Sequence, residues 1–155
     1  MILNGTFTFN GPRQQVWDLL QDPEVLAKAL PGTERLTLAG PDRYDGVMKV
    51  SVGPMTAAKF DVTVMLADKR PPEHFTMQID AKGALGFARG TAAVDLQEQA
   101  GGTLMQYSSD VQVGGRIASV GQRLIESVSK MMMRQALEAL HGELRARINA
   151  DPGRS

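Results

Sequence analysis

The chain has 155 residues, of which 43% are hydrophobic, a share that is typical of one globular domain and argues against intrinsic disorder. Its 17 lysines and arginines balance its 17 aspartates and glutamates, so no bulk positive charge would attract nucleic acid. It contains no cysteine, which excludes disulfides, thiolate catalysis and cysteine-ligated metals and is consistent with a reducing compartment.

Alternating apolar and polar residues predict a first strand over residues 2–9. Asn10 and Pro12 are typical of residues that start a helix, and Pro23 begins a second short helix that Gly32 ends. We expect Trp17, on the apolar face of the first helix, to lie in the core. The amino-terminal part is therefore predicted to place one strand and two short helices before the main sheet.

Six further strands are predicted, because apolar residues alternate with polar ones between turns rich in glycine and proline. They cover residues 34–39, 43–52, 56–69, 73–82, 86–99 and 103–113. Most of the connections are short, so we expect these strands to form an antiparallel meander.

A single long helix is predicted from Gly115 to about Ile148, since apolar side chains recur there every three to four residues. At ~1.5 Å per residue it would be roughly 48 Å long. We expect one α+β domain over residues 1–148, in which a curved seven-stranded antiparallel sheet wraps around this helix. Residues 149–155 are expected to form a short flexible tail.

The strand pattern predicts a pocket between the sheet and the long helix. Gly90, Ala92 and Ser109 are small residues on the inward face, and we expect Gly121 inside the helix to permit a close approach. A void lined by methionine and phenylalanine suits an apolar ligand; the alternative is a core that large side chains fill. The candidate lining residues are Tyr44, Met48, Val50, Phe60, Val62, Phe75, Met77, Gly90, Ala92, Tyr107, Ser109, Val120, Gly121, Leu124 and Val128.

Motifs for catalysis or metal binding are absent from the sequence. His74 and His141 have no second ligand nearby, and there is no nucleophile elbow, phosphate loop or dinucleotide fingerprint. The inward hydroxyls of Tyr44, Tyr107 and Ser109 have no evident base beside them. We therefore expect no catalytic residue and no metal.

The carboxyl-terminal segment carries a mild positive charge. From Gly114 onward it has seven lysines and arginines against four acids. A solvated helix face is one interpretation, and weak docking to an anionic membrane or an acidic partner is the other. The amino terminus lacks the features of a signal peptide, and no apolar run reaches the ~20 residues of a membrane span. We expect a cytoplasmic protein whose membrane contact, if any, is peripheral.

The order of these elements resembles the helix-grip, or START-like, fold of the SRPBCC superfamily, which includes polyketide cyclase-like domains. Short motifs then resemble one family within it, CoxG, the G subunit of carbon monoxide dehydrogenase. These motifs are Asp-Pro-Glu (22–24), Leu-Pro-Gly (30–32), Tyr-Asp-Gly (44–46), Val-Ser-Val-Gly-Pro (50–54), Ala-Arg-Gly-Thr-Ala (88–92), Tyr-Ser-Ser-Asp-Val-Gln-Val-Gly-Gly (107–115) and Ser-Val-Gly-Gln-Arg-Leu-Ile (119–125).

This resemblance implies a non-catalytic accessory protein associated with a molybdenum hydroxylase of the carbon monoxide dehydrogenase type. Family members are thought to attach the enzyme to the cytoplasmic membrane or to carry quinone. Menaquinone or ubiquinone would then be the carried, non-covalent ligand. Some relatives have a long carboxyl-terminal extension proposed to reach the membrane, whereas this sequence stops at Ser155, so we expect transient docking.

Two alternatives remain. A START-like enzyme would need a base beside the inward hydroxyls. A protein-only assembly factor would use an exposed apolar stripe on the long helix around Leu137, Leu140 and Leu144.

Overall fold

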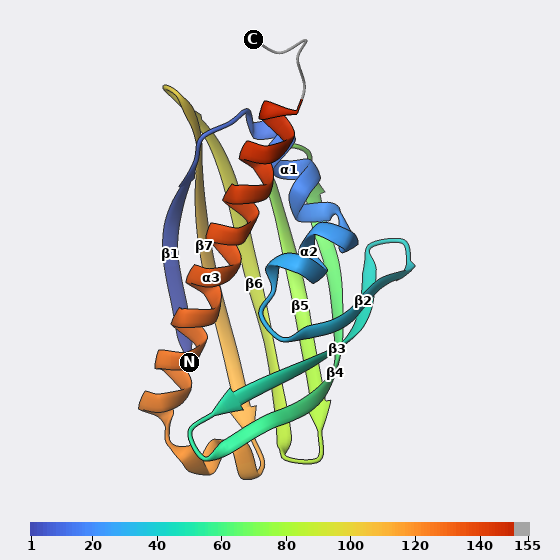
Figure 1. The fold of residues 1–155 in the computed structure, drawn as a ribbon, viewed down its shortest axis with the longest axis vertical. Helices are drawn as coiled ribbons and strands as arrows, with labels where there is room; N and C mark the ends of the chain where they lie inside the picture. Colours follow the sequence, from blue (N-terminus) through green and yellow to red (C-terminus); the bar gives the residue numbers. More distant parts are fainter. Residues whose placement is uncertain (151–155) are drawn as a thin grey trace.

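One curved antiparallel sheet forms the body of the molecule, and a long helix crosses its concave face (Figure 1). The structure is a computed structural model and describes residues 1–150. Its seven strands lie in the order β1-β7-β6-β5-β4-β3-β2. They are β1 (Ile2–Phe9), β2 (Thr33–Gly40), β3 (Arg43–Val52), β4 (Met55–Arg70), β5 (His74–Gly83), β6 (Gly86–Gln99) and β7 (Gly102–Gly114).

The predicted strands and the antiparallel meander are confirmed. Strands β2 to β7 pair in sequence order, and β1 closes the sheet against β7, with Ile2 opposite Asp110 and Phe9 opposite Thr103. Alternate residues of each strand therefore point to the concave face, as the sequence pattern indicated. The two short helices follow β1 as predicted; they are α1 (Arg13–Gln21) and α2 (Pro23–Ala29).

The single helix predicted from Gly115 to Ile148 is wrong at its start. The structure has a short 3₁₀ helix, η1 (Arg116–Val120), and then α3 (Gln122–Asn149). Gly115 and Gly121 flank η1 with φ values of 82° and 101°, a left-handed conformation that glycine adopts at low cost and that ends a regular helix. Gly121 thus separates η1 from α3, and no atom beyond its chain neighbours lies within 4 Å of the place where a Cβ would be.

The apolar core is divided into two clusters along α3. The upper cluster joins the carboxyl-terminal half of α3 to α1, α2 and the sheet, and in it Phe9, Phe75 and Leu144 are fully buried. Trp17 is 5% exposed, as predicted, and packs edge-to-face on Phe75 with ring centroids 5.4 Å apart. The lower cluster, formed by Val52, Ala58, Phe60, Val62 and Ile117, lies under η1 and the amino-terminal half of α3.

The carboxyl-terminal half of α3 is packed, so the apolar stripe considered for protein binding is not on the surface. Leu137, Leu140 and Leu144 are 5%, 4% and 0% exposed. Residues 151–155, which make up most of the predicted tail, lie outside the described residues. Of the rest of that tail, Asn149 is the last residue of α3. Within residues 1–150 no helix is long and apolar enough to cross a membrane.

Candidate ligand-binding pocket

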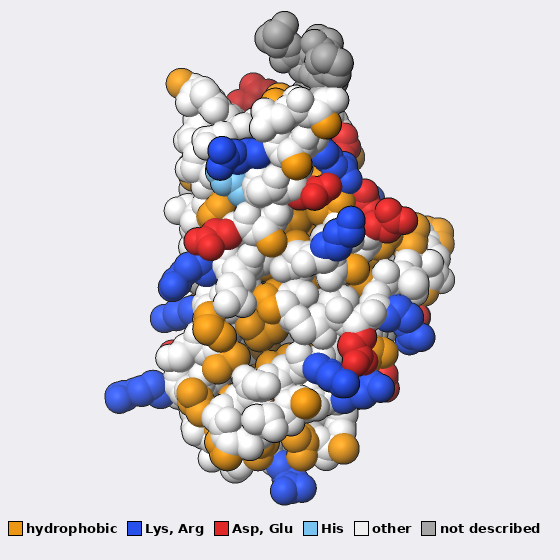
Figure 2. All heavy atoms as spheres, viewed as in Figure 1, with side chains coloured by type: hydrophobic (Ala, Val, Ile, Leu, Met, Phe, Trp, Pro, Cys, Tyr) orange, Lys and Arg blue, Asp and Glu red, His pale blue; other side chains and the backbone are white. Residues whose placement is uncertain are grey.

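An apolar pocket of about 180 Å³ lies between the sheet and the amino-terminal half of α3. Hydrophobic side chains reach the surface beside this part of α3, in the lower half of the space-filling view (Figure 2). The lining comes from β3, β4, β5, β6, β7, η1 and α3, and consists of Met48, Val50, Val52, Phe60, Val62, Ala81, Phe87, Ala88, Val113, Ile117, Ile125, Val128, Ser129 and Met132.

The pocket exists because the two halves of α3 are supported differently. The carboxyl-terminal half packs on α1, α2 and the large side chains of the upper cluster. The amino-terminal half has no such helices behind it, and the sheet presents the small side chains of Ala81 and Ala88 to it. As a result Ile125, Val128 and Met132 are only half-buried.

The size and lining of the pocket fit an apolar ring. A water molecule needs two to four polar partners, and this lining offers almost none. A dry protein cavity of about 150 Å³ lined by aliphatic and aromatic side chains takes up benzene, and the present pocket is about 180 Å³. The flexible Met48 and Met132 allow its shape to adjust.

Ser129 is the single polar residue among the described residues that line the pocket. Two buried hydroxyl groups elsewhere are paired, since Thr103 Oγ1 donates to Gly11 O at 2.8 Å and Ser109 Oγ donates to Leu3 O at 2.9 Å, whereas the buried Thr33 Oγ1 has no partner among the described residues. No hydrogen bond is found for the Ser129 hydroxyl within residues 1–150. Ser129 is only half-buried, and its hydroxyl oxygen is not one of the buried side-chain atoms that lack a partner, so water can reach it.

Part of the residue set predicted from the sequence meets in this pocket. Met48, Val50, Phe60, Val62 and Val128 line it. Val120 and Leu124 belong to the same apolar cluster without lining the pocket itself.

Other predicted residues lie further along the concave face. Phe75, Met77 and Tyr107 pack in the upper cluster, to which Trp17 also belongs, and not in the lower cluster under η1. Ala92 is half-buried between them, opposite Met77 on one side and Ser109 on the other. Gly121 stands at the start of α3, with open space around it.

Tyr44 and Ser109 have structural roles. Ser109 ties β7 to β1 through the bond to Leu3, and the Tyr44 hydroxyl donates to Gln21 O at 2.6 Å, which fixes β3 to the end of α1. Burial, followed by the charges of Asp42 and Asp22, raises the pKa of the Tyr44 phenol above its ordinary value. No described carboxylate or histidine is hydrogen-bonded to these hydroxyls.

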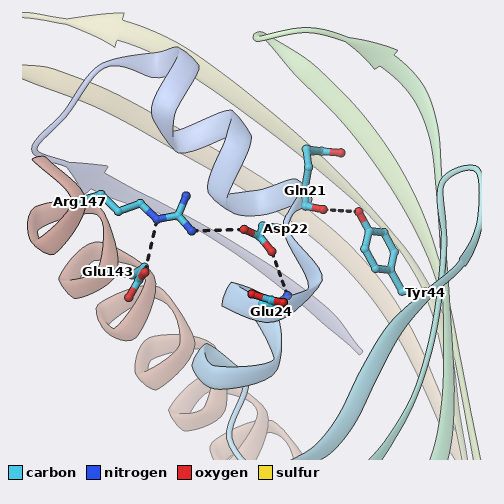
Figure 3. A network of polar contacts seen from close by, with 6 residues as sticks. All are labelled: Gln21, Asp22, Glu24, Tyr44, Glu143 and Arg147. Carbon is cyan, nitrogen blue, oxygen red and sulfur yellow. Dashed lines mark hydrogen bonds and ion pairs between the residues drawn. The ribbon is translucent and has the colours of Figure 1, made fainter. Parts of the chain in front are cut away.

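A polar network locks α1 and α2 against α3 at the end remote from the pocket (Figure 3). The carboxylate of Asp22 accepts from Glu24 N at 3.0 Å and so caps α2, while Arg147 of α3 contacts the other Asp22 oxygen at 3.2 Å. Arg147 also donates to Glu143 at 3.4 Å. The network therefore links α1 and α2 to the carboxyl-terminal half of α3 through partly exposed side chains.

A larger hollow, of about 1060 Å³, borders the middle of the sheet. Its lining includes the predicted Gly90 and mixes inward residues such as Ile79 and Val111 with outward ones such as Arg89 and Asp110. Because it touches both faces of the sheet, it is not one enclosed chamber. No group of three or more histidine, cysteine or acidic residues in the described structure could hold a metal ion.

Several lining residues were not among the site predictions. Val52, Ala81, Ala88 and Val113 lie on the inward phase of their strands, so the alternation already marked them as interior. Ser129 and Met132 depend on the rotation of α3, which the sequence pattern did not fix.

The chain matches the family model of CoxG, the G subunit of carbon monoxide dehydrogenase, over residues 5–145. No curated protein matches it. Among solved structures, a conserved protein from Geobacillus kaustophilus is 26% identical with a TM-score of 0.89, over 94% of this chain and 96% of that chain. Protein Ms6760 from Mycobacterium smegmatis is 17% identical with a TM-score of 0.72, over 94% and 92% of the two chains.

One further structure bears on the fold alone. The di-domain ARO/CYC BexL from the BE-7585A biosynthetic pathway is 15% identical with a TM-score of 0.63, over 92% of this chain and 49% of that chain. The sheet wrapped around a long carboxyl-terminal helix confirms the predicted helix-grip fold. Since the family match spans nearly the whole described structure, this chain belongs to the CoxG family of carbon monoxide dehydrogenase G subunits.

Proposed function

We propose that this chain is a non-catalytic accessory protein that binds a hydrophobic small molecule, a quinone or another lipid, between α3 and the sheet. The observation that carries the proposal is the unfilled apolar pocket of about 180 Å³. Its apolar lining is left partly exposed to water, at a cost of about 25 cal/mol per Å² of apolar surface that is not buried. Ligand binding would offset that cost.

Menaquinone or ubiquinone is the proposed physiological ligand. The pocket, about 180 Å³, accommodates a ring but not a long isoprenoid tail. The tail would leave through the open side beside Val128 and Met132, where α3 is half-buried. The flexible side chain of Met132, at that opening, can change its conformation to make room for the tail.

The partner proposed for this carrier is a molybdenum hydroxylase of the carbon monoxide dehydrogenase type. Support comes from membership of the CoxG family. In this role the chain would assist the enzyme in electron transfer or in association with the membrane, without catalytic residues of its own.

Transient contact with the inner face of the cell membrane is part of the proposal. Arg116, Arg123, Lys130 and Arg134 are exposed on η1 and the pocket half of α3, and none forms an ion pair with another described residue. Met131 is 46% exposed among them. Cations near an anionic bilayer contribute about 1 kcal/mol each, which supports a weak, reversible contact.

The two alternatives have less support. An enzyme would need its hydroxyls beside a base, whereas Tyr44 and Ser109 donate to backbone carbonyl groups. An assembly factor that docks through Leu137, Leu140 and Leu144 would need those side chains exposed, and they are buried.

Ligand binding is tested by thermal unfolding of the purified chain with menaquinone, ubiquinone or a saturated hydrocarbon of similar length, together with native mass spectrometry for co-purified lipid. A ligand at about 100 times its Kd stabilises the fold by about 2.7 kcal/mol. For a domain of this size, that raises the Tm by roughly 5–10 °C. A Tm that no quinone changes, with no bound mass, would contradict the proposal.

A further inference from the structure

We propose that the tip of the β5–β6 hairpin is a second binding site, in which Lys82, Arg89 and Arg116 hold the phosphate group of a phosphomonoester. The site is an open hollow of about 430 Å³, here called the tip hollow, which is bordered by residues 82–87, Arg89, Gly115 and Arg116. It adjoins the apolar pocket at Phe87, which lines both. The proposal goes beyond the proposed function and does not depend on a ligand in the apolar pocket.

The first argument is the charge around the tip hollow. Its ionisable residues are Lys82 from β5, Arg89 from β6 and Arg116 from η1, and no acidic residue among residues 1–150 borders it. All three side chains are exposed. Three cations from three separate elements thus border one space, and an anion placed between them is attracted by all three.

The second argument is that these cations have little pairing of their own. Neither Arg89 nor Arg116 forms an ion pair within residues 1–150, and Lys82 approaches exposed Asp80 only to 3.9 Å. Asp80 lies directly opposite Arg89 in the β5–β6 ladder, yet the two side chains do not pair. Instead the Arg89 Cζ lies 5.0 Å from the centre of the Phe87 ring, and this cation–π contact holds the guanidinium beside the tip hollow. The donors of both arginines are therefore available to an anion.

The third argument is the fixed backbone beneath the tip hollow. The β5–β6 turn lies beside η1 at the lower end of the molecule (Figure 1), and Ile117 N donates to Leu85 O at 2.7 Å. The two segments come so close that a Cβ on Gly115 would lie 2.6 Å from the Cα of Gly86. Since this contact and this bond fix η1 against the hairpin, the two arginines are brought to one site before a ligand arrives, which reduces the cost of ordering them.

The charge of the tip hollow favours a phosphomonoester over a phosphodiester. A phosphomonoester carries a charge of about −1.5 to −2 at pH 7 and three acceptor oxygens. Arginine can donate two parallel N–H bonds to phosphate, and lysine binds it as a point charge. Two sources supply this chemistry, namely phosphatidic acid in a membrane and a soluble phosphomonoester such as glycerol 3-phosphate.

The first experiment titrates the isotope-labelled chain with glycerol 3-phosphate at low salt and follows the backbone amide chemical shifts. We expect the shifts to be concentrated at residues 82–89 and 114–117. Dimethyl phosphate, a phosphodiester, should bind about tenfold more weakly. Arg89→Gln and Arg116→Gln should each lower the affinity for glycerol 3-phosphate about tenfold, which is the effect of one hydrogen bond to a charged group.

Both single variants change exposed side chains, so they should fold, and the Tm of each checks this. The matched control is Lys130→Gln with Arg134→Gln, which removes two exposed cations of α3 that do not border the tip hollow. The control should bind glycerol 3-phosphate as tightly as the wild-type chain. The comparison separates a defined site from general attraction between an anion and a positively charged surface.

The second experiment identifies the source of the phosphate. It compares flotation with phosphatidylcholine vesicles that contain either phosphatidic acid or phosphatidylglycerol, matched for net charge. A preference for phosphatidic acid that is lost in Arg89→Gln assigns the site to a lipid headgroup. Equal binding to both kinds of vesicle, with glycerol 3-phosphate still bound, assigns it to a soluble phosphomonoester.

Three results would overturn the site itself. They are the absence of any response to glycerol 3-phosphate, an affinity that neither single variant lowers, and a loss in the α3 control as large as that in the single variants. The proposed function would stand in each case, because it is tested with quinones and concerns a different pocket.

Discussion

The two halves of α3 should respond very differently to the same truncation. Leu144 is 0% exposed in the upper cluster, whereas Leu124 is half-buried in the lower cluster near the pocket. Leu→Ala changes at fully buried sites cost about 2.7–5.0 kcal/mol, because they add an unfilled cavity to the loss of burial. We expect Leu144→Ala to cost about 4 kcal/mol and Leu124→Ala about 1 kcal/mol, since Leu124 is only half-buried and its truncation leaves no enclosed cavity.

Urea unfolding monitored by the single tryptophan provides the measurement, with thermal unfolding as a second probe. For a domain of this size, 1 kcal/mol corresponds to a Tm change of roughly 2–4 °C. Leu144→Ala should therefore lower the Tm by about 8–16 °C and Leu124→Ala by about 2–4 °C. Equal costs at the two sites would refute the division of the core into a closed half and an open half.

The remaining predictions concern stability, pH and the membrane. Tyr44→Phe should cost about 1 kcal/mol by removing the bond to Gln21 O. The folded-state pKa of Tyr44 is raised above 10.0, so the stabilising effect of its hydroxyl is complete below pH 10 and is lost as the pH rises through the folded-state pKa. The urea midpoints of the wild-type chain and Tyr44→Phe should therefore converge at alkaline pH. A constant difference between the two midpoints would contradict this. Gly46→Ala should cost about 1–3 kcal/mol in urea unfolding, since the new Cβ would meet the backbone carbonyl of Arg35 in β2, and a neutral effect would argue against this strand pairing. Lys130→Gln with Arg134→Gln should weaken sedimentation with vesicles containing anionic phosphatidylglycerol by about 30-fold. The control is Arg70→Gln with Arg145→Gln, because these two arginines are also exposed but are remote from the pocket. An equal loss of vesicle binding in the control would contradict a docking face on the pocket half of α3.

The sheet could be predicted from the sequence because its signals are local. Alternation in residues 43–52 and 86–99 matches β3 and β6, and the turns between strands coincide with glycine and proline. The start of the last helix could not be predicted in the same way. Apolar spacing continues from Ile117 through Val120 into α3, so the pattern reads as one helix, and only the φ values at Gly115 and Gly121 reveal the break.

The pocket was harder to predict than the fold, because alternation tells which face of the sheet a residue occupies but not how far along it. Phe75 and Tyr107 point inward as expected, yet they pack in the upper cluster, which fills the space there. Met48 and Phe60 point inward by the same rule and reach the open part. The difference depends on where the helices cover the sheet, which is a property of the tertiary structure.

The central claim, that the space between α3 and the sheet binds a ligand, is tested most directly by filling it. Ala88 lines the pocket from β6, whereas Ala93 on the same strand points to the opposite face of the sheet. Titration of menadione into Ala88→Leu and Ala93→Leu compares a blocked pocket with a matched change on the other face. We predict at least a tenfold loss of affinity in Ala88→Leu and an unchanged affinity in Ala93→Leu. Equal affinities in both variants and the wild-type chain would place the ligand elsewhere and contradict the claim.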